Sequence, residues 1–251
     1  MSLANMGIMV CKGKALGLLK SQRMIDMTIA KNVFMVLDTE TADFNGSVYD
    51  VGYVICNKRG EIVVERNWLV KEVFTDGSAM MGAFYAKKLF SHYAPMLEAG
   101  EIKITPWIEI IATMNADIRD YGVTVICAYN AGFDFRVMRN THKQLGFSGA
   151  VLEQGLQTLD LWRFACETKL SQKQYRIIAE SQGWISEAGN LRSGAEYAYR
   201  FCSGDFGFIE DHTALSDARI EAQIMAECFR MKKRVPYGEI NGQPWRIIQA
   251  A

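Results

Sequence analysis

Short apolar runs bounded by turns mark the first part of the chain. Residues 33–38 predict a buried strand, and residues 49–57 and 61–70 predict two more strands. The turn at residues 58–60 ends in glycine and separates the last two strands. We therefore expect an antiparallel meander at the start of the folded region.

The pattern changes to alternating strands and helices after Thr105. Thr105 and Pro106 predict an N-cap and a first-turn proline for a helix that runs to about residue 121, followed by a strand at 123–128. Two pairs have capping-box spacing, Ser171 with Gln174 and Ser193 with Glu196. Further helices are predicted at residues 133–145 and 161–168, from residue 171, and after residue 212.

The last predicted helix has apolar residues at helical spacing, which favours a stripe packed on the core over a cofactor site. These residues are Leu215, Ala218, Ala222, Met225 and Phe229. A meander, crossover strands and covering helices together predict an α/β fold. We expect a mixed five-stranded sheet with helices on both faces, similar to the ribonuclease-H-like architecture.

Composition favours one compact domain. The chain has 251 residues with 49% apolar content, which is enough for a substantial single core. No Pro/Gly/Ser-rich linker or internal repeat interrupts it. We expect a folded domain over residues 32–232, a partly helical N-terminal extension over residues 1–31 and a C-terminal tail over residues 233–251.

No segment predicts a membrane span or an export signal. The apolar runs are strand-sized, whereas a membrane-spanning helix needs about 18 or more apolar residues. The amphiphilic N-terminal stretch lacks the features of a secretory signal. The six cysteines are widely spaced with no C-x-x-C pair, which argues against a zinc site or a disulfide framework. We expect a cytoplasmic protein with reduced thiols and no membrane partner.

Charge limits the kind of nucleic-acid contact that the chain can make. It has 28 basic and 28 acidic residues, and so no net attraction to polyanions. Sequence-independent coating of a duplex is therefore disfavoured. Any contact with nucleic acid should be local and short, such as binding at a chain end.

Asp38 and Glu40 form the first candidate functional pair. One residue separates them, so on an extended strand both side chains point to the same face and can share a cation. Their repulsion would raise at least one pKa, and Mg²⁺ or Mn²⁺ removes that penalty through oxygen ligands. They lie at the predicted C-terminal end of the first strand, where open α/β sheets usually bind ligands. Alone, such a pair is more often a solvated strand end.

Two later segments supply the remaining candidates. Asp134 follows the strand at 123–128 and a turn, where it is either a helix cap or a metal-site residue. His212 and Asp217 would diverge by about 140° on one ideal helix. They converge if His212 precedes the helix, Thr213 caps it and Asp217 lies within it. A loop histidine with a pKa near 6.5 can take a proton from water at neutral pH, although a lone histidine at this spacing is more often a surface residue.

The three segments together resemble the motifs of the DEDDh 3′→5′ exonucleases, the family that includes polymerase proofreading subunits, ribonuclease T and oligoribonuclease. The resemblance spans residues 33–231, and histidine in place of tyrosine in the third motif is typical of the "h" branch. The motifs read Leu37-Asp38-Thr39-Glu40-Thr41, Asn130-Ala131-Gly132-Phe133-Asp134 and His212-Thr213-Ala214-Leu215-Ser216-Asp217-Ala218.

The resemblance implies a two-metal phosphodiesterase with Mg²⁺ or Mn²⁺ as cofactor. It implies that Asp38, Glu40 and Asp217 hold the first ion. Asp38 would bridge to the second ion, Asp134 would support the second ion through water, and His212 would be the general base. The two ions would lie about 4 Å apart, and in-line attack on the terminal phosphodiester would release a 5′-mononucleotide.

Substrate contacts are predicted around the first two motifs. The candidates are Thr39, Thr41, Ala42, Phe44, Asn130 and Phe133. Relatives often continue the first motif with a small residue, a glycine and an apolar wedge between bases, and this chain departs from that pattern. Phe44 is either a base-stacking residue or a core residue, and we favour the core because aromatic residues near strand ends are usually buried.

Three other features are interpreted as structural. The aromatic-rich segment 184–211 is predicted to cover the core, because Tyr197 and Phe201 have i,i+4 packing spacing. His92 and His142 lack carboxylate companions and are predicted to be structural or exposed. A basic stripe after Asp134 is interpreted as a solvated face, with phosphate contact as the alternative; it consists of Arg136, Arg139 and Lys143.

The favoured function is a metal-dependent 3′→5′ exonuclease that acts on single-stranded DNA ends. A 3′→5′ exoribonuclease is an alternative, because the sequence has no clear signature of 2′-OH recognition. A catalytically inert module that binds nucleic-acid ends or a polymerase is another, although such modules usually lose part of the acidic set that this chain keeps. Expected partners are single-stranded 3′ ends and a polymerase or a replication and repair complex, and a homodimer is left open.

Overall fold

A six-stranded sheet forms the centre of the protein in a computed structural model that describes residues 32–240 and 242–249. The order across the sheet is β4-β3-β2-β1-β5-β6. The strands are β1 (Phe34–Asp43), β2 (Gly46–Cys56), β3 (Ile62–Val70), β4 (Lys103–Thr105), β5 (Val125–Ala128) and β6 (Gln157–Asp160). The N-terminal extension predicted over residues 1–31 lies outside the described residues.

The strand directions follow the predicted plan. β1, β2 and β3 form the antiparallel meander, whereas β5 and β6 continue the sheet in parallel from β1. The predicted mixed α/β class is confirmed. The predicted strand number was wrong, because β4 adds a sixth strand parallel to β3. β4 has only three residues at the sheet edge, too few to show an alternating pattern.

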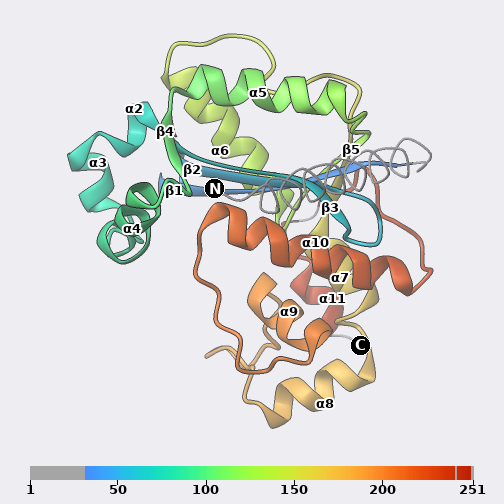
Figure 1. Cartoon of the computed structure of the whole chain (residues 1–251). Helices are drawn as coiled ribbons and strands as arrows, with labels where there is room; N and C mark the ends of the chain where they lie inside the picture. Colours follow the sequence, from blue (N-terminus) through green and yellow to red (C-terminus); the bar gives the residue numbers. More distant parts are fainter. Residues whose placement is uncertain (1–31, 241, 250–251) are drawn as a thin grey trace, which may run out of the picture.

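Helices cover both faces of the sheet (Figure 1). Met35 and Leu37 of β1 face a core shared with α5 and α6, and Phe34 and Val36 face a second core shared with α7 to α10. The longer helices are α5 (Trp107–Asp120), α6 (Ala131–Gln144), α7 (Leu161–Thr168), α8 (Lys173–Ser181), α9 (Ala195–Ser203) and α10 (Ala214–Arg230). The alternation along β1 therefore decides which face carries each side chain.

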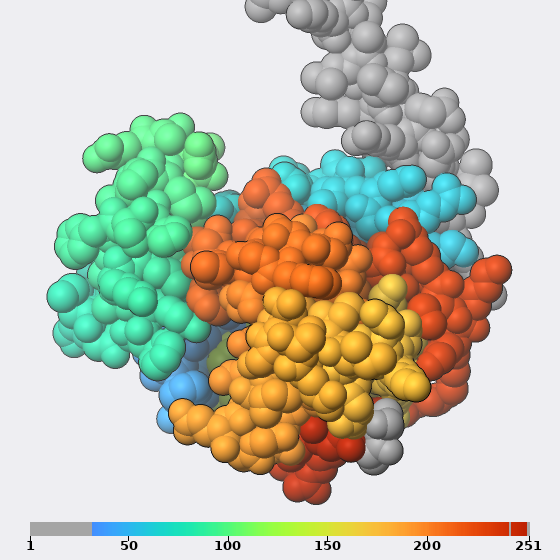
Figure 2. All heavy atoms as spheres, turned by 90° about the horizontal axis from the view of Figure 1, so that it is seen from below, coloured from blue at the N-terminus to red at the C-terminus, as the bar shows by residue number. Residues whose placement is uncertain are grey.

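Residues 71–102 form a helical lobe beside the sheet, for which the sequence predicted no element. The lobe contains α2 (Lys71–Phe74), α3 (Gly77–Gly82), the π-helix η1 (Leu89–Tyr93) and α4 (Ala94–Glu98). Each of these helices is shorter than two turns, so no helical periodicity marks it. In Figure 2 the lobe, in teal and green, lies beside the orange α9 region, and blue residues of the first hairpin are visible below the place where the two meet.

β1 is longer than predicted, and this moves the first acidic pair. Asp38 and Glu40 lie within the strand and not at its end, because β1 continues to Asp43 as a hairpin with β2. The parallel neighbour β5 pairs with β1 only as far as Val36. Asp38 and Glu40 therefore lie on the part of β1 that extends beyond its pairing with β5.

The predicted helix caps at Thr105 and Ser171 are wrong. In the first case another side chain binds the helix amide, and in the second the serine hydroxyl binds other groups. Thr105 belongs to β4, and Glu72 accepts the Trp107 amide at the start of α5 with an Oε2–N distance of 3.0 Å. Ser171 precedes α8 but donates to the carbonyl oxygens of Glu167 and Thr168.

The second predicted capping box, Ser193 with Glu196, is also wrong. α9 begins after Gly194 with no side-chain cap. The hydroxyl of Ser193 instead accepts a hydrogen bond from the Trp162 indole at 2.9 Å, and Glu196 accepts the amide of Glu210 at 3.0 Å. Both side chains thus connect α9 to neighbouring segments.

α10 lies unusually close to the sheet at Gly52, the cross-strand partner of Asp38. A Cβ atom at Gly52 would lie 2.2 Å from the amide nitrogen of Leu215, a distance that real Cβ atoms do not reach. Only glycine therefore allows the first turn of α10 to rest on the β2 backbone.

The start of α10 is fixed by an acid from the sheet. Thr213 occupies the predicted N-cap position, but its hydroxyl donates to Asp211 at 2.9 Å and makes no cap. Asp50 on β2 takes this role, since its Oδ2 accepts the Ala214 amide at 3.0 Å and the Tyr93 hydroxyl at 2.8 Å. Asp50 thus ties α10 both to the sheet and to the helical lobe.

The predicted apolar stripe of α10 is confirmed. Ala218, Ala222 and Met225 are fully buried, and Leu215 and Phe229 pack against the same core from partly buried positions. The predicted core cover is confirmed as well, because Tyr197 and Phe201 pack there.

Other expectations concern side-chain chemistry and the chain end. The five described cysteines are free thiols. His142 is buried against the Trp107 indole, with 3.1 Å between Nδ1 and Nε1.

Within residues 32–240 and 242–249, no helix is both long and apolar enough to cross a membrane. The segment predicted as a C-terminal tail includes α11 (Trp245–Gln249), which packs near α7 and buries Ile248.

Candidate active site

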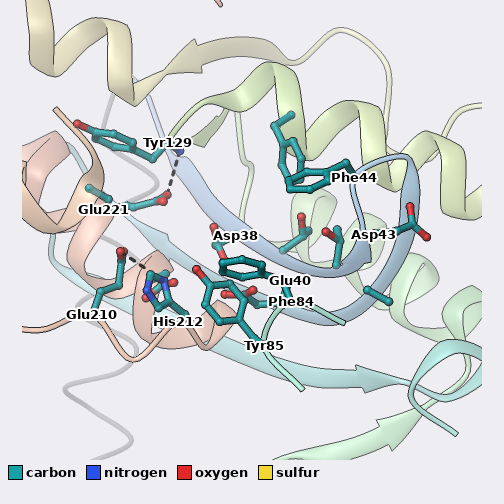
Figure 3. A pocket seen from close by; sticks show the side chains of 16 residues that line it. Asp38, Glu40, Asp43, Phe44, Phe84, Tyr85, Tyr129, Glu210, His212 and Glu221 are labelled. Carbon is teal, nitrogen blue, oxygen red and sulfur yellow. Dashed lines mark hydrogen bonds and ion pairs between the residues drawn. The ribbon is translucent and has the colours of Figure 1, made fainter. Parts of the chain in front are cut away.

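A cavity of about 360 Å³ opens where β1, the start of α10 and the helical lobe meet (Figure 3). It brings together four of the five predicted catalytic residues, namely Asp38, Glu40, His212 and Asp217. The lining residues are Asp38, Thr39, Glu40, Thr41, Ala42, Asp43, Phe44, Phe84, Tyr85, Tyr129, Phe133, Ala195, Glu210, His212, Asp217 and Glu221.

Asp134 and Asn130 lie outside the set of described residues that line the cavity. Asp134 is buried in the first turn of α6, and its Oδ1 accepts a hydrogen bond from the Thr39 hydroxyl at 2.8 Å. This bond places Asp134 beside the residue that follows Asp38, and the charge of Asp134 is one cause of the raised pKa of Asp38. Asn130 occupies the N-cap of α6 with a left-handed backbone, a conformation that asparagine tolerates well. The other predicted substrate contacts all line the cavity.

Glu40, His212 and Asp217 meet the geometric requirements of a cation site. One ligand atom from each lies within 4.8 Å of the others. Asp217 is only 5% exposed, and its Oδ1 has no hydrogen-bond partner within the described part of the chain. Carboxylate oxygens are the ligands that Mg²⁺ and Mn²⁺ prefer, and an unpartnered buried oxygen needs a positive or donor group. The residues therefore fit a divalent cation.

Burial makes the acids of the cavity hard to ionise. It raises the pKa of Asp217 to about 9 and that of Glu40 to about 8. It also raises the pKa of Asp38 well above its usual range, with the Asp217 charge as the next cause. For Glu40 the ammonium of Lys88 opposes the effect of burial. A bound divalent cation would favour the ionised forms of all three acids.

The metal-free protein is expected to lose stability as pH rises from 6 to 8.5. The raised pKa values mean that the folded state still holds protons that the unfolded chain releases near the ordinary Asp value of 3.8. The contribution of these groups to stability is therefore present at low pH and is lost as pH rises toward 9. In EDTA, we expect the melting temperature at pH 8.5 to be at least about 4 °C lower than the melting temperature at pH 6.

Differential scanning calorimetry in EDTA checks this expectation. The Asp217→Asn variant is the control, since it lacks a group whose pKa is raised to about 9 and should show a weaker dependence on pH. A melting temperature that is constant or rises over this interval would contradict the burial of uncompensated acids.

His212 precedes α10 in the loop, as predicted, and its side chain is held on two sides. Its ring stacks on Tyr85 with 4.8 Å between centroids and 25° between planes. Its Nδ1 lies 3.5 Å from Oε2 of Glu210. Burial lowers the pKa of His212, and the charge of Lys88 lowers it further. The imidazole is therefore neutral at pH 7 and able to accept a proton.

Three further acids that line the cavity were not predicted, namely Asp43, Glu210 and Glu221. Glu221 lies one turn after Asp217 on α10, is buried, and accepts the Tyr129 amide at 3.1 Å. Burial raises its pKa well above the usual range, with the charge of Asp134 as the next cause. Its i+4 spacing from Asp217 is a sequence signal that could have placed it on the same helix face. Glu210 has no comparable signal, because its position depends on the path of the loop.

Phe44 is not a core residue, and the favoured prediction for it was wrong. Its side chain is 76% exposed and lines the cavity. β1 continues to Asp43, so Phe44 is carried past the sheet into the β1–β2 turn. Arg136 donates to the Phe44 carbonyl at 2.7 Å, whereas Arg139 and Lys143 are exposed as predicted. Phe84, from the lobe, lines the same cavity and is 80% exposed.

Comparison with known proteins gives a limited result. No protein-family model and no curated protein matches the chain. Among solved structures, the chain is similar to exonuclease X in complex with 5′ overhanging duplex DNA. The TM-score is 0.43 with 18% sequence identity, over 86% of this chain and 99% of the other. Because the overall similarity is low, the function proposed below rests on the side chains of this chain.

Proposed function

We propose that this protein is a metal-dependent 3′→5′ exonuclease that releases 5′-mononucleotides from single-stranded DNA ends. The observation that supports it best is the convergence of Asp38, Glu40, His212 and Asp217 on one cavity from two segments far apart in the sequence. Several buried acids in one place are unfavourable unless a cation accompanies them. The 3′→5′ polarity is inferred from the motifs that resemble the DEDDh exonucleases.

Two cations are expected, and different acids would bind each of them. Asp38, Glu40 and Asp217 would hold the first ion, Asp38 would also reach the second, and Asp134 would act on the second through water. When bound, the two ions would supply positive charge that activates water and stabilises the charge developing on the phosphate.

His212 would act as the general base. Its Nδ1 faces Glu210, so Nε2 is the ring nitrogen left to accept a proton from the attacking water. The water oxygen attacks phosphorus in line, and the bond from phosphorus to the 3′ oxygen of the preceding nucleotide breaks. That oxygen takes up a proton from solvent, which leaves a 5′-mononucleotide and a strand shortened by one residue.

Phe44 and Phe84 are expected to bind bases of the substrate strand. Both rings are exposed and line the cavity, one from the β1–β2 turn and one from the helical lobe. Stacking of a base on an aromatic ring contributes about 1–3 kcal/mol. Phe44→Ala and Phe84→Ala should therefore each raise KM about tenfold with little change in kcat or melting temperature.

Steady-state kinetics on single-stranded oligonucleotides checks the two variants. Phe90→Ala is the matched control, because Phe90 is 77% exposed in the same lobe but does not line the cavity. Equal KM values for all three variants and the parent protein would show that the exposed rings do not bind substrate.

Digestion of 5′-labelled single-stranded DNA and matched RNA tests the proposed function itself. With Mn²⁺ or Mg²⁺ we expect a ladder that shortens from the 3′ end, faster on DNA than on RNA, and no digestion in EDTA. Faster digestion of RNA would favour the exoribonuclease alternative. Binding without digestion under any metal condition would favour the inert module.

A further inference from the structure

Lys88 is a buried lysine that reaches the candidate active site from the helical lobe. It directly precedes η1 and is only 3% exposed. Lysine is almost never fully buried without partners, because its ammonium group must keep its hydrogen bonds and charge compensation. Its position 124 residues before His212 in the sequence lies in none of the three motifs.

Three groups surround the ammonium of Lys88. Nζ donates a hydrogen bond to the backbone carbonyl of His212. It lies 3.4 Å from Oε1 of Glu40 and 3.8 Å from the centre of the Tyr85 ring. The carbonyl, the carboxylate and the ring face together match the three donors of an ammonium group.

The backbone of His212 needs such support. Its φ is 56°, in the left-handed region that residues other than glycine rarely adopt. A conformation of this kind persists only where the surroundings hold it. Lys88 holds the carbonyl of His212, while Tyr85, three residues earlier in the same turn, stacks on the imidazole. One short segment of the lobe therefore contacts both the backbone and the ring of His212.

We propose that Lys88 and Tyr85 are positioning residues that fix the imidazole of His212 for proton transfer. The inference rests on the proposed exonuclease function and adds a second element to it. The lobe supplies the support for the base, whereas the sheet and α10 supply the acids. Lys88 acts through His212 and does not itself contact the reacting atoms.

A purely electrostatic role for Lys88 would give a different result from a positioning role. Its ammonium lies beside Glu40, so removing the charge alone would leave divalent cations bound as tightly as before or more tightly. Loss of His212 positioning, by contrast, slows turnover without weakening the binding of metal or substrate. A misplacement of about 1 Å can slow a reaction about 100-fold.

The Lys88→Met variant of the full chain tests the proposal, with Lys87→Met as the matched control. Lys87 is the adjacent lysine and is exposed. For Lys88→Met we expect kcat on single-stranded DNA to fall about 10- to 100-fold at saturating Mn²⁺. KM should change less than about threefold, and the Mn²⁺ affinity measured by titration calorimetry should be equal or tighter. Lys87→Met should behave like the parent protein.

A pair of variants at Tyr85 tests the same proposal without changing charge. Tyr85→Phe keeps the ring over His212 and should retain kcat, whereas Tyr85→Leu removes the ring and should lower kcat about tenfold or more. This pair decides the matter if Lys88→Met fails to fold.

Two outcomes would overturn the positioning role. One is a kcat within twofold of the parent protein for both Lys88→Met and Tyr85→Leu. The other is a loss of rate in Lys88→Met that excess Mn²⁺ restores, because Lys88 would then act on the metal site. If the parent protein itself releases no nucleotide, the proposed exonuclease function is wrong. If the parent protein is active and only the variants disagree with expectation, the positioning role alone is wrong.

Discussion

Asp217→Asn is expected to abolish metal-dependent nucleotide release and also to stabilise the metal-free protein. Asp217 is buried, its Oδ1 has no hydrogen-bond partner within the described residues, and burial raises its pKa to about 9. The amide removes the charge that a cation needs, so kcat should fall by about 1,000-fold or more. The same change removes the cost of keeping a buried carboxyl group protonated at a pH where the unfolded chain releases the proton, so the melting temperature in EDTA at pH 8 should rise by at least about 2 °C.

Nucleotide release at saturating Mn²⁺ measures the first effect, and thermal melts with and without Mn²⁺ measure the second. The parent protein should gain stability as Mn²⁺ is added, and Asp217→Asn should gain little. Asp120→Asn, at an exposed position at the end of α5, is the control and should match the parent protein. A variant that retains activity, or that is less stable than the parent protein in EDTA, would contradict the proposed metal site.

His212→Ala is expected to lower kcat by about 10²–10⁴-fold, the usual contribution of a general base. Burial and the charge of Lys88 keep the imidazole neutral, so the parent protein has a base ready at pH 7. The variant should still bind Mn²⁺ with an affinity within about threefold of the parent protein. Nucleotide release at saturating Mn²⁺ and titration calorimetry measure the two quantities.

The measurement of Mn²⁺ affinity separates two roles for His212. One of its ring nitrogens lies within 4.8 Å of ligand atoms of Glu40 and Asp217, so a role as a metal ligand is also compatible with the geometry. A ligand role would lower affinity and rate together, and this result would contradict the general-base assignment. His92→Ala is the control, because His92 contacts only its neighbour Ser91 among the polar groups described for it.

The parts of the site that follow from local geometry were predictable from the sequence. The two-residue period of a strand places Asp38 and Glu40 on one face, and the structure has both lining the cavity. The reasoning that placed His212 before a helix and Asp217 within it also depended on only six residues, and it is confirmed. Sequence spacing was sufficient in these cases because each pair lies within one element or at its boundary.

The parts that depend on long-range contacts could not be predicted. Lys88 and Tyr85 reach His212 from a lobe whose helices are too short to show periodicity. Asp50 takes the capping role predicted for Thr213, although 164 residues separate it from the amide that it accepts. Phe44 was assigned to the core because the extra length of β1, which depends on pairing with β2, was not visible in the sequence.

Transfer of this site to another protein would require the glycine at position 52 as well as the catalytic side chains. Gly52 faces Asp38 across the hairpin and also supports the first turn of α10, so it sets the gap between the strand and the helix. A methyl group there would collide with the Ala214 and Leu215 backbone and force the first turn of α10, which carries Asp217, away from β2. Grafting the acids and the histidine onto another scaffold would therefore not be enough. The recipient would also need a strand that a helix can touch main chain to main chain.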